Sequence, residues 1–279
     1  MTTQFQLMLS GNRRIAIDNF SEWTGSRSIR LFGVRVGIQT NEPELLDRLT
    51  DYFPPLWQPT SAATVDRIFS LRVGKATSTV FENHEQGLKA QSLKRVLEDF
   101  ERRLKMYVAE MARHRVFVHA GAVGWKGKAI IIPGRSYSGK TTLVRELVRA
   151  GAIYYSDEYA VLDMQGQLHP YPQPLAIRTP GFLGQKKSPV ESFGGVVGRK
   201  PLPVGLVVVS NYRENARWRP LQLTPGHGIL ALLDNTVSAR RNPAVVLPTL
   251  QKAVRAATIL KGERSEADAI ISRLFEKCR

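Results

Sequence analysis

The chain has 279 residues, 43% hydrophobic and 23% charged, a composition typical of folded globular proteins rather than disordered ones. It has no run of about 18 apolar residues, and its first residues lack the pattern of a secretory signal, so we expect neither a membrane span nor export. A single cysteine, Cys278, cannot form an intrachain disulfide, and the cytoplasm is the expected location. The net charge of +16 indicates either a basic, solvated surface or an anionic partner. Because the basic residues are scattered, nucleic acid is a less favoured partner.

Residues 1–85 predict a small α+β domain. Apolar and polar side chains alternate over 28–40, which predicts one strand, and 66–74 and 78–83 predict two more. Between them, 42–54 predicts a short helix that ends at two consecutive prolines. This part of the sequence shows no catalytic cluster.

Residues 86–113 predict a linking helix between two domains. Apolar residues recur there at steps of three and four, as in an amphipathic helix that packs on a core. They are Leu93, Leu97, Phe100, Leu104, Tyr107 and Met111.

Residues 114–279 predict a second domain that begins with a strand, a glycine-rich loop, a helix and another strand. Residues 116–123 predict a strand, 125–128 a hairpin turn, and 128–134 a wholly apolar strand covered on both faces. A helix over 140–152, ended by Gly151, and a strand region over 153–163 follow.

The loop between this strand and this helix fits the Walker A pattern G-x-x-x-x-G-K-[ST]. Glycines let main-chain N–H groups point inward, and these groups together with the helix N-terminus hold phosphate oxygens. Lys140 should reach the β- and γ-phosphates, and the Thr141 hydroxyl should face Mg²⁺. The predicted nucleotide-binding residues are Gly134, Arg135, Ser136, Tyr137, Ser138, Gly139, Lys140, Thr141 and Thr142.

Two acidic residues, Asp157 and Glu158, occur where the next strand should end. Ligands of open α/β sheets bind at the carboxyl ends of the strands, so these acids are candidates for metal binding and proton transfer. Adjacent strand residues point to opposite faces, so both acids can serve one site only if the strand ends or twists there.

The order and spacing of these features over roughly 110–275 resembles the catalytic domain of HPr kinase/phosphorylase and its relatives, a superfamily akin to phosphoenolpyruvate carboxykinase. The resemblance implies an α/β, P-loop kinase domain. It implies that Asp157 accepts the proton of the acceptor hydroxyl, that Glu158 helps to bind Mg²⁺, and that His119 lies near the transferred phosphoryl group. Read alone, His119 is more typical of a core histidine.

Further along, 170–181 resembles a family segment that contacts the metal and the phosphorylated partner. Arg178 matches its arginine, whereas Ala176 stands where the family carries glutamate, which argues against the reverse, phosphorylase, reaction. Arg240 and Arg241 precede a helix with Pro243 near its start, and one of them is a candidate contact for the acceptor or a phosphate. The glycine-rich stretch 181–200 is a candidate lid or docking loop.

The sequence therefore predicts a kinase that uses ATP or GTP with Mg²⁺ and phosphorylates a hydroxyl, foremost serine in a protein or peptide. Some relatives modify ribosomally made peptides, and the family resemblance implies a homo-oligomer. Two alternatives stay open: a kinase of a small-molecule or nucleic-acid hydroxyl, and a regulatory module that binds nucleotide without transfer.

Overall fold

The computed structural model describes residues 15–16, 22–135, 138–178 and 185–278. The chain divides into two compact units, Met1–Arg113 and His114–Arg279. Among the described residues, no helix combines the length and the apolar character that crossing a bilayer requires.

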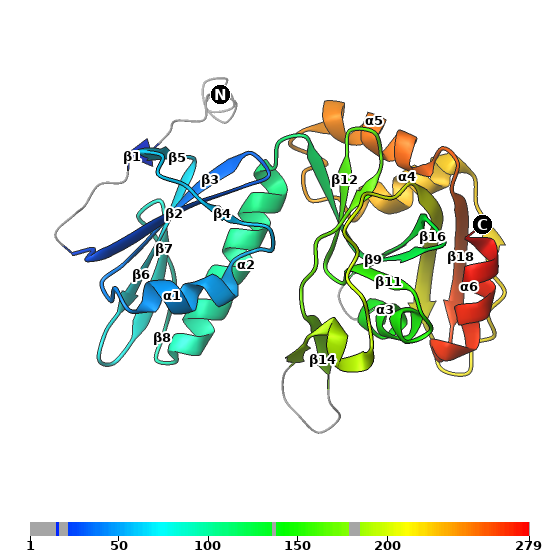
Figure 1. Cartoon of the computed structure of the whole chain (residues 1–279), viewed down its shortest axis with the longest axis horizontal. Coiled ribbons are helices and arrows are strands. Elements are labelled where there is room, and N and C mark those ends of the chain that lie inside the picture. Colours follow the sequence, from blue (N-terminus) through cyan, green and yellow to red (C-terminus); the bar gives the residue numbers. More distant parts are fainter. Residues whose placement is uncertain (1–14, 17–21, 136–137, 179–184, 279) are drawn as a thin grey trace, which may run out of the picture. The chain divides into compact units, whose positions relative to one another are not determined.

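The N-terminal unit is built on a six-stranded sheet in the order β4-β2-β3-β6-β7-β8, in which only the β3–β6 pair is parallel among the described strands. Helices α1 (Leu45–Leu49) and α2 (Leu93–Met111) pack on one face of it (Figure 1). The short 3₁₀ helix η1 (Thr50–Tyr52) follows α1. The strands are β2 (Gly25–Leu31), β3 (Val34–Thr40), β4 (Gln58–Pro59), β6 (Arg67–Val73), β7 (Ser78–Glu82) and β8 (Glu85–Ala90), with β1 (Ile15–Ala16) and β5 (Thr64–Val65) paired separately.

Two sequence predictions for this unit need correction. The stretch 28–40 is part of a hairpin rather than one strand, because Phe32 and Gly33 both have positive φ (48° and 79°) and reverse the chain. The helix predicted over 86–113 begins at Leu93, and the residues just before it belong to β8. The residues of β8 do not alternate between polar and apolar, so no sequence pattern distinguishes this strand from the helix that follows it.

Helix α2, predicted as a linking segment, contributes to the core of the N-terminal unit. The apolar side chains on its core-facing side are at most 6% exposed and pack with those of β2, β3, β6 and β7. They include Val96, Leu97, Phe100, Leu104, Tyr107 and Val108.

The C-terminal unit is a mixed α/β fold on an eight-stranded sheet in the order β13-β12-β9-β10-β16-β18-β17, with β11 also paired to β9. Strands β10, β16 and β18 are parallel, so their carboxyl ends meet at one edge. The strands are β9 (Arg115–Trp125), β10 (Lys128–Pro133), β11 (Ile153–Ser156), β12 (Tyr159–Asp163), β13 (Leu168–His169), β16 (Val204–Tyr212), β17 (Leu221–Gln222) and β18 (Thr258–Arg264).

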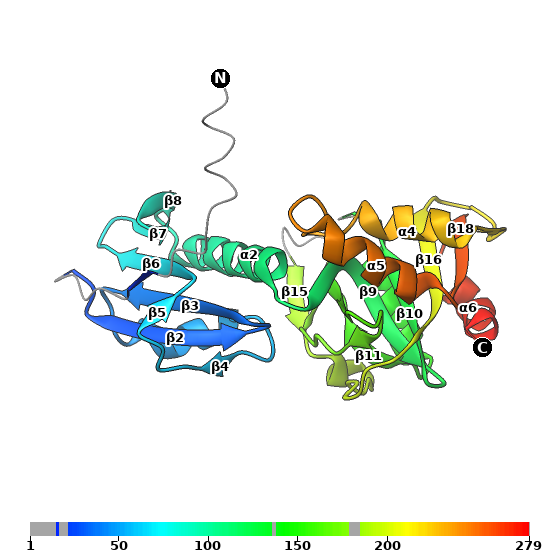
Figure 2. The same cartoon turned by 90° about the horizontal axis from the view of Figure 1, so that it is seen from above.

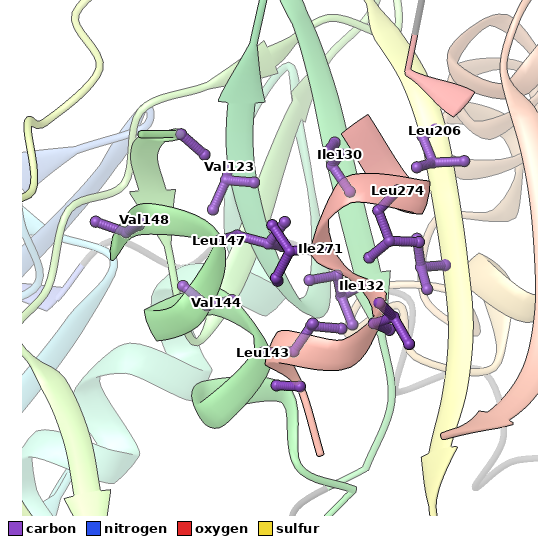
Figure 3. Packing of buried hydrophobic residues seen from close by; sticks show 14 of the residues in the cluster. Val123, Ile130, Ile132, Leu143, Val144, Leu147, Val148, Leu206, Ile271 and Leu274 are labelled. Atoms are coloured by element: carbon purple, nitrogen blue, oxygen red, sulfur yellow. The ribbon is translucent and has the colours of Figure 1, made fainter. Parts of the chain in front are cut away.

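Helices cover both faces of this sheet. On one face, α3 (Lys140–Arg149) and α6 (Ile271–Lys277) place apolar side chains against those of β10 (Figure 3). On the other, α4 (Pro225–Leu233) and α5 (Pro243–Val254) run side by side (Figures 1 and 2). The middle of β10, from Ala129 to Ile132, is at most 1% exposed, which confirms the prediction from its apolar run.

Three smaller elements complete the unit. Strand β14 (Leu175–Arg178), in the family-like segment 170–181, pairs antiparallel with β15 (Gln185–Ser188), in the glycine-rich stretch 181–200. The 3₁₀ helix η2 (Val190–Phe193) follows it, and η3 (Asp268–Ile270) precedes α6. Residues 179–184, part of the stretch proposed as a lid, lie outside the described residues.

Candidate active site

The predicted phosphate loop connects the end of β10 to the start of α3. Gly139 is the residue before the helix and has a left-handed φ of 82°. A Cβ atom at Gly139 would lie 2.6 Å from Nη2 of Arg264, and one at Gly134 would lie 2.8 Å from Oγ of Ser138. Both positions therefore require glycine, for conformation or for space. Ser136 and Tyr137 lie outside the described residues.

Lys140 is the first residue of α3, and its ammonium folds back onto the loop. Nζ donates to the carbonyl oxygens of Gly134 (2.7 Å) and Arg135 (2.8 Å). The side chain is 7% exposed, and burial lowers its pKa. The arrangement places a positive charge directly inside the turn of the loop.

The remaining loop residues differ in burial. Arg135 and Thr142 are exposed, whereas Ser138 and Thr141 are partly buried. Oγ of Ser138 is inaccessible and has no hydrogen-bond partner in the described part of the chain. A buried hydroxyl without a partner is unusual in a folded protein and marks a place where a ligand can bond.

The two predicted acids lie where the strand paired with β9 is interrupted. Strand β11 ends at Ser156 and β12 begins at Tyr159, so Asp157 and Glu158 stand between two stretches that both pair with β9. Oγ of Ser156 accepts from the N–H groups of Glu158 (3.3 Å) and Tyr159 (3.0 Å), which stabilises the break. The strict alternation of strand side chains therefore does not apply to the two acids.

Asp157 joins the acid segment to the start of α3. Oγ1 of Thr141 donates to Oδ2 of Asp157 at 3.0 Å, and the main-chain N–H of Ala176 in β14 also hydrogen-bonds to this carboxylate. Among the described residues, Oδ1 has no partner and is inaccessible. Burial raises the pKa of Asp157 to about 6, and Glu158 adds to the rise, while Thr141 and Lys140 oppose it.

His119 lies in β9 beside the loop. Its main-chain N–H donates to the main-chain carbonyl of Asn235 (2.7 Å), and its main-chain carbonyl accepts from the N–H of Gly134 (3.4 Å). Burial lowers the pKa of the His119 ring to about 4, and the charge of Lys140 adds to this effect. The ring is therefore neutral at physiological pH, and it can donate one hydrogen bond and accept one.

The other predicted residues are placed with less detail. Glu158 is partly buried next to Asp157. Arg178 ends β14, and its side chain lies outside the described part of the chain. Arg240 and Arg241 are exposed in the turn before α5, and no described contact links them to the phosphate loop.

Arg264 is a residue that the sequence analysis missed. It ends β18, is 1% exposed, and donates through Nη2 to the carbonyl of Gly139 (2.7 Å) and through Nη1 to the carbonyl of Ser265 (3.0 Å). Burial lowers the pKa of its guanidinium, and no described carboxylate forms an ion pair with it. No local sequence pattern points to it, because Arg264 reaches Gly139 only through the pairing of β18 with β16.

Comparisons with known proteins give similarity to solved structures alone, and it is distant. No family model matches the chain, and no curated protein matches it. The solved structure of the Hpr(Ser) kinase/phosphatase from Coxiella burnetii is 18% identical, covers 57% of this chain and 93% of its own, and has a TM-score of 0.35. A similarity of this size does not identify the activity of either unit.

Proposed function

We propose that the C-terminal unit is a Mg²⁺-dependent kinase that binds ATP or GTP and transfers the γ-phosphoryl group to a hydroxyl, foremost that of serine in a protein or peptide. The observation that carries this proposal is the 3.0 Å hydrogen bond between Thr141 and Asp157. It joins the start of the helix behind a Walker A loop to a partly buried acid, one oxygen of which has no hydrogen-bond partner among the described residues.

The loop supplies the charge that a triphosphate needs. Main-chain N–H groups at the start of α3 and the positive end of the helix dipole attract phosphate oxygens. Lys140 is already held inside the turn, and Arg264 adds a second buried cation behind Gly139. In a site of low dielectric, such fixed charges stabilise the charge of a transferring phosphoryl group strongly.

The donor set near Asp157 fits Mg²⁺. Among the described residues, no cluster of three or more His, Cys, Asp or Glu side chains could hold a metal by itself. Mg²⁺ does not need one, because it is usually bound by one or two carboxylates together with substrate phosphates and water. The Thr141 hydroxyl and Glu158 would hold it, which leaves Asp157 beside them for proton transfer. When bound, Mg²⁺ would neutralise charge on the phosphates.

Asp157 is the proposed base. With a pKa of about 6, its carboxylate is largely ionised at neutral pH and basic enough to take the proton of the acceptor hydroxyl as that oxygen bonds to phosphorus. The bond between the γ-phosphorus and the bridging oxygen breaks, and the nucleoside diphosphate leaves. The neutral ring of His119 would hydrogen-bond to the phosphoryl group or to the acceptor without adding charge.

The proposal of a serine hydroxyl as the acceptor rests on the motif resemblance, from which this chain departs at Ala176. Ala176, where the family carries glutamate, contributes its main-chain N–H to Asp157 and no carboxylate. A carboxylate of the expected metal shell is therefore missing here, which argues against a phosphorylase activity. This departure is also the feature behind the alternative that the unit binds nucleotide without catalysis.

The test is incubation of the full chain with radiolabelled ATP, Mg²⁺ and cell extract, comparing the wild type with Asp157→Asn. We expect label on a protein or peptide band, falling by about 10²-fold or more in the variant while ATP affinity changes little. Label on small molecules or RNA would support the second kind of acceptor. Tight ATP binding with no transfer to any acceptor would support the non-catalytic module.

A further inference from the structure

The carboxyl ends of β16 and β18 form a surface next to the phosphate loop. Tyr212, the last residue of β16, pairs in register with Arg264, the last residue of β18. Its Cβ atom lies 3.7 Å from the position that a Cβ on Gly139 would take. Tyr212 therefore borders the loop at the residue from which α3 begins.

The ring of Tyr212 is both exposed and fixed. The residue is 49% exposed, unusually high for a large aromatic side chain beside a sheet. Its hydroxyl donates to Oε1 of Glu266 at 3.2 Å. Strand side chains alternate, so Tyr212 projects from the same face as Val208, the face that α3 covers. An aromatic ring held at one end with an open face suits a planar ligand.

The strand order shows on which side of the loop a nucleoside must lie. The loop follows β10, which has β9 on one side and β16 on the other. The transfer groups Asp157 and His119 belong to the β9 side. The chain near Thr236 also bridges to β9 at Val118, beside His119. With the γ-phosphate directed to that side, the rest of the nucleotide extends toward β16 and β18.

We propose that Tyr212 is a nucleotide-binding residue that stacks on the base of the nucleotide, with Glu266 holding the ring in place. The inference rests on the proposed function, since it assigns the base side of the same site. It is independent of the identity of the phosphate acceptor. Stacking uses the face of the ring, so it tolerates both ATP and GTP.

The experiment compares two probes, MgATP and magnesium tripolyphosphate, by calorimetric titration of the full chain. Tyr212→Ala and Tyr212→Leu should weaken MgATP binding about 10-fold, the scale of one lost base–aromatic stack, and leave tripolyphosphate binding unchanged. Tyr212→Phe keeps the ring but loses its hydrogen bond to Glu266, so it should bind MgATP more tightly than Tyr212→Ala and more weakly than the wild type. Leu221→Ala, at an apolar residue 70% exposed on β17, is the control and should change neither affinity.

The outcomes separate the two claims. Equal loss of both probes in Tyr212→Ala would mean that the tyrosine only supports the loop, and no loss of either would mean that the base lies elsewhere; each overturns the stacking role alone. A wild type that binds tripolyphosphate as tightly as MgATP also overturns it. A wild type that binds neither probe overturns the proposed function and this inference together.

Discussion

The two units treat buried charge in opposite ways. In the N-terminal unit, Glu101 and Lys105 lie one turn apart on α2 and pair at 2.7 Å, with side chains 12% and 11% exposed. In the C-terminal unit, the buried cations Lys140 and Arg264 donate to carbonyl oxygens, and neither forms an ion pair with a described carboxylate. Asp157 and Glu266 act on them only at longer range, so these two cations are not neutralised by direct pairing as Lys105 is.

The difference indicates which charges are structural. A buried ion costs several kcal/mol of desolvation free energy unless a partner compensates it, so a fold selected only for stability pairs its charges. Even Arg67 in the N-terminal unit, whose Nε has no partner, pairs with Glu82 at 3.3 Å and stacks over Tyr107. Buried cations that converge on one loop without partners are better explained by an anionic ligand.

The largest expected effect is that of Lys140→Ala. Removing the ammonium takes away a fixed charge at the proposed γ-phosphate, and we expect both MgATP affinity and phosphoryl transfer to fall by about 10²-fold or more. Calorimetric titration and the radiolabel assay measure the two losses. If both stayed within tenfold of the wild type, the lysine would only complete the turn, and the contrast between the units would lose its main support.

Lys105→Met tests the matched pair. It leaves the Glu101 carboxylate buried without its partner, and we expect a loss of about 3 kcal/mol in the free energy of unfolding, by analogy with other broken buried pairs. The double variant Glu101→Leu/Lys105→Met should recover much of that loss. Urea titrations measure it, and MgATP affinity should stay at the wild-type value. A tenfold change in affinity would contradict a purely structural role for the pair.

Asp157→Asn should stabilise the protein when nucleotide and Mg²⁺ are absent. The pKa of Asp157 is raised from 3.8 to about 6 on folding, so the folded state resists ionisation, and stability falls as the pH rises from about 4 through 6. Asparagine does not ionise and avoids that loss. We expect it to be about 3 kcal/mol more stable at pH 8 and nearly equal at pH 4.

Thermal unfolding with a chelator at the two pH values measures this difference. Thr141→Val is a matched control that removes the hydroxyl donor to the same carboxylate, and it should not stabilise the protein. Equal stabilisation of Asp157→Asn at both pH values would show that the effect does not come from the ionised carboxylate.

Much of the C-terminal sheet could be predicted because its signals are local. An apolar run predicts the buried strand β10, and Gly127 and Gly151, both with positive φ, mark a hairpin turn and a helix end. The hairpin at Phe32 and Gly33 was missed because alternation continues through the turn. Strand β8 was missed because its place in the sheet depends on pairing with β7, which no local pattern encodes.

The residues of the candidate site likewise divide into those that local motifs predict and those that only strand pairing brings to the site. Loop and acid residues follow from short motifs, and the structure shows how they meet: Thr141 touches Asp157, and the loop N–H of Gly134 reaches His119. Arg264 and Tyr212 were missed because they come from strands 52 residues apart in the sequence and approach Gly139 only through the parallel pairing of β16 with β18. The roles of Arg178, Arg240 and Arg241 stay predictions.

The smallest expected effect is that of Arg264, which acts on the phosphates through the carbonyl of Gly139. Arg264→Met removes the buried cation and both of its hydrogen bonds, and MgATP should bind about 10-fold more weakly, because one charged hydrogen bond near a phosphate site is worth about 1.5–3 kcal/mol. Arg264→Lys keeps the charge but not the fork of donors, and it should recover part of the affinity. Calorimetric titration gives both values. If Arg264→Met lowered the melting temperature but left MgATP affinity intact, Arg264 would contribute to stability and not to nucleotide binding. The contrast between the buried charges of the two units would then rest on Lys140 alone.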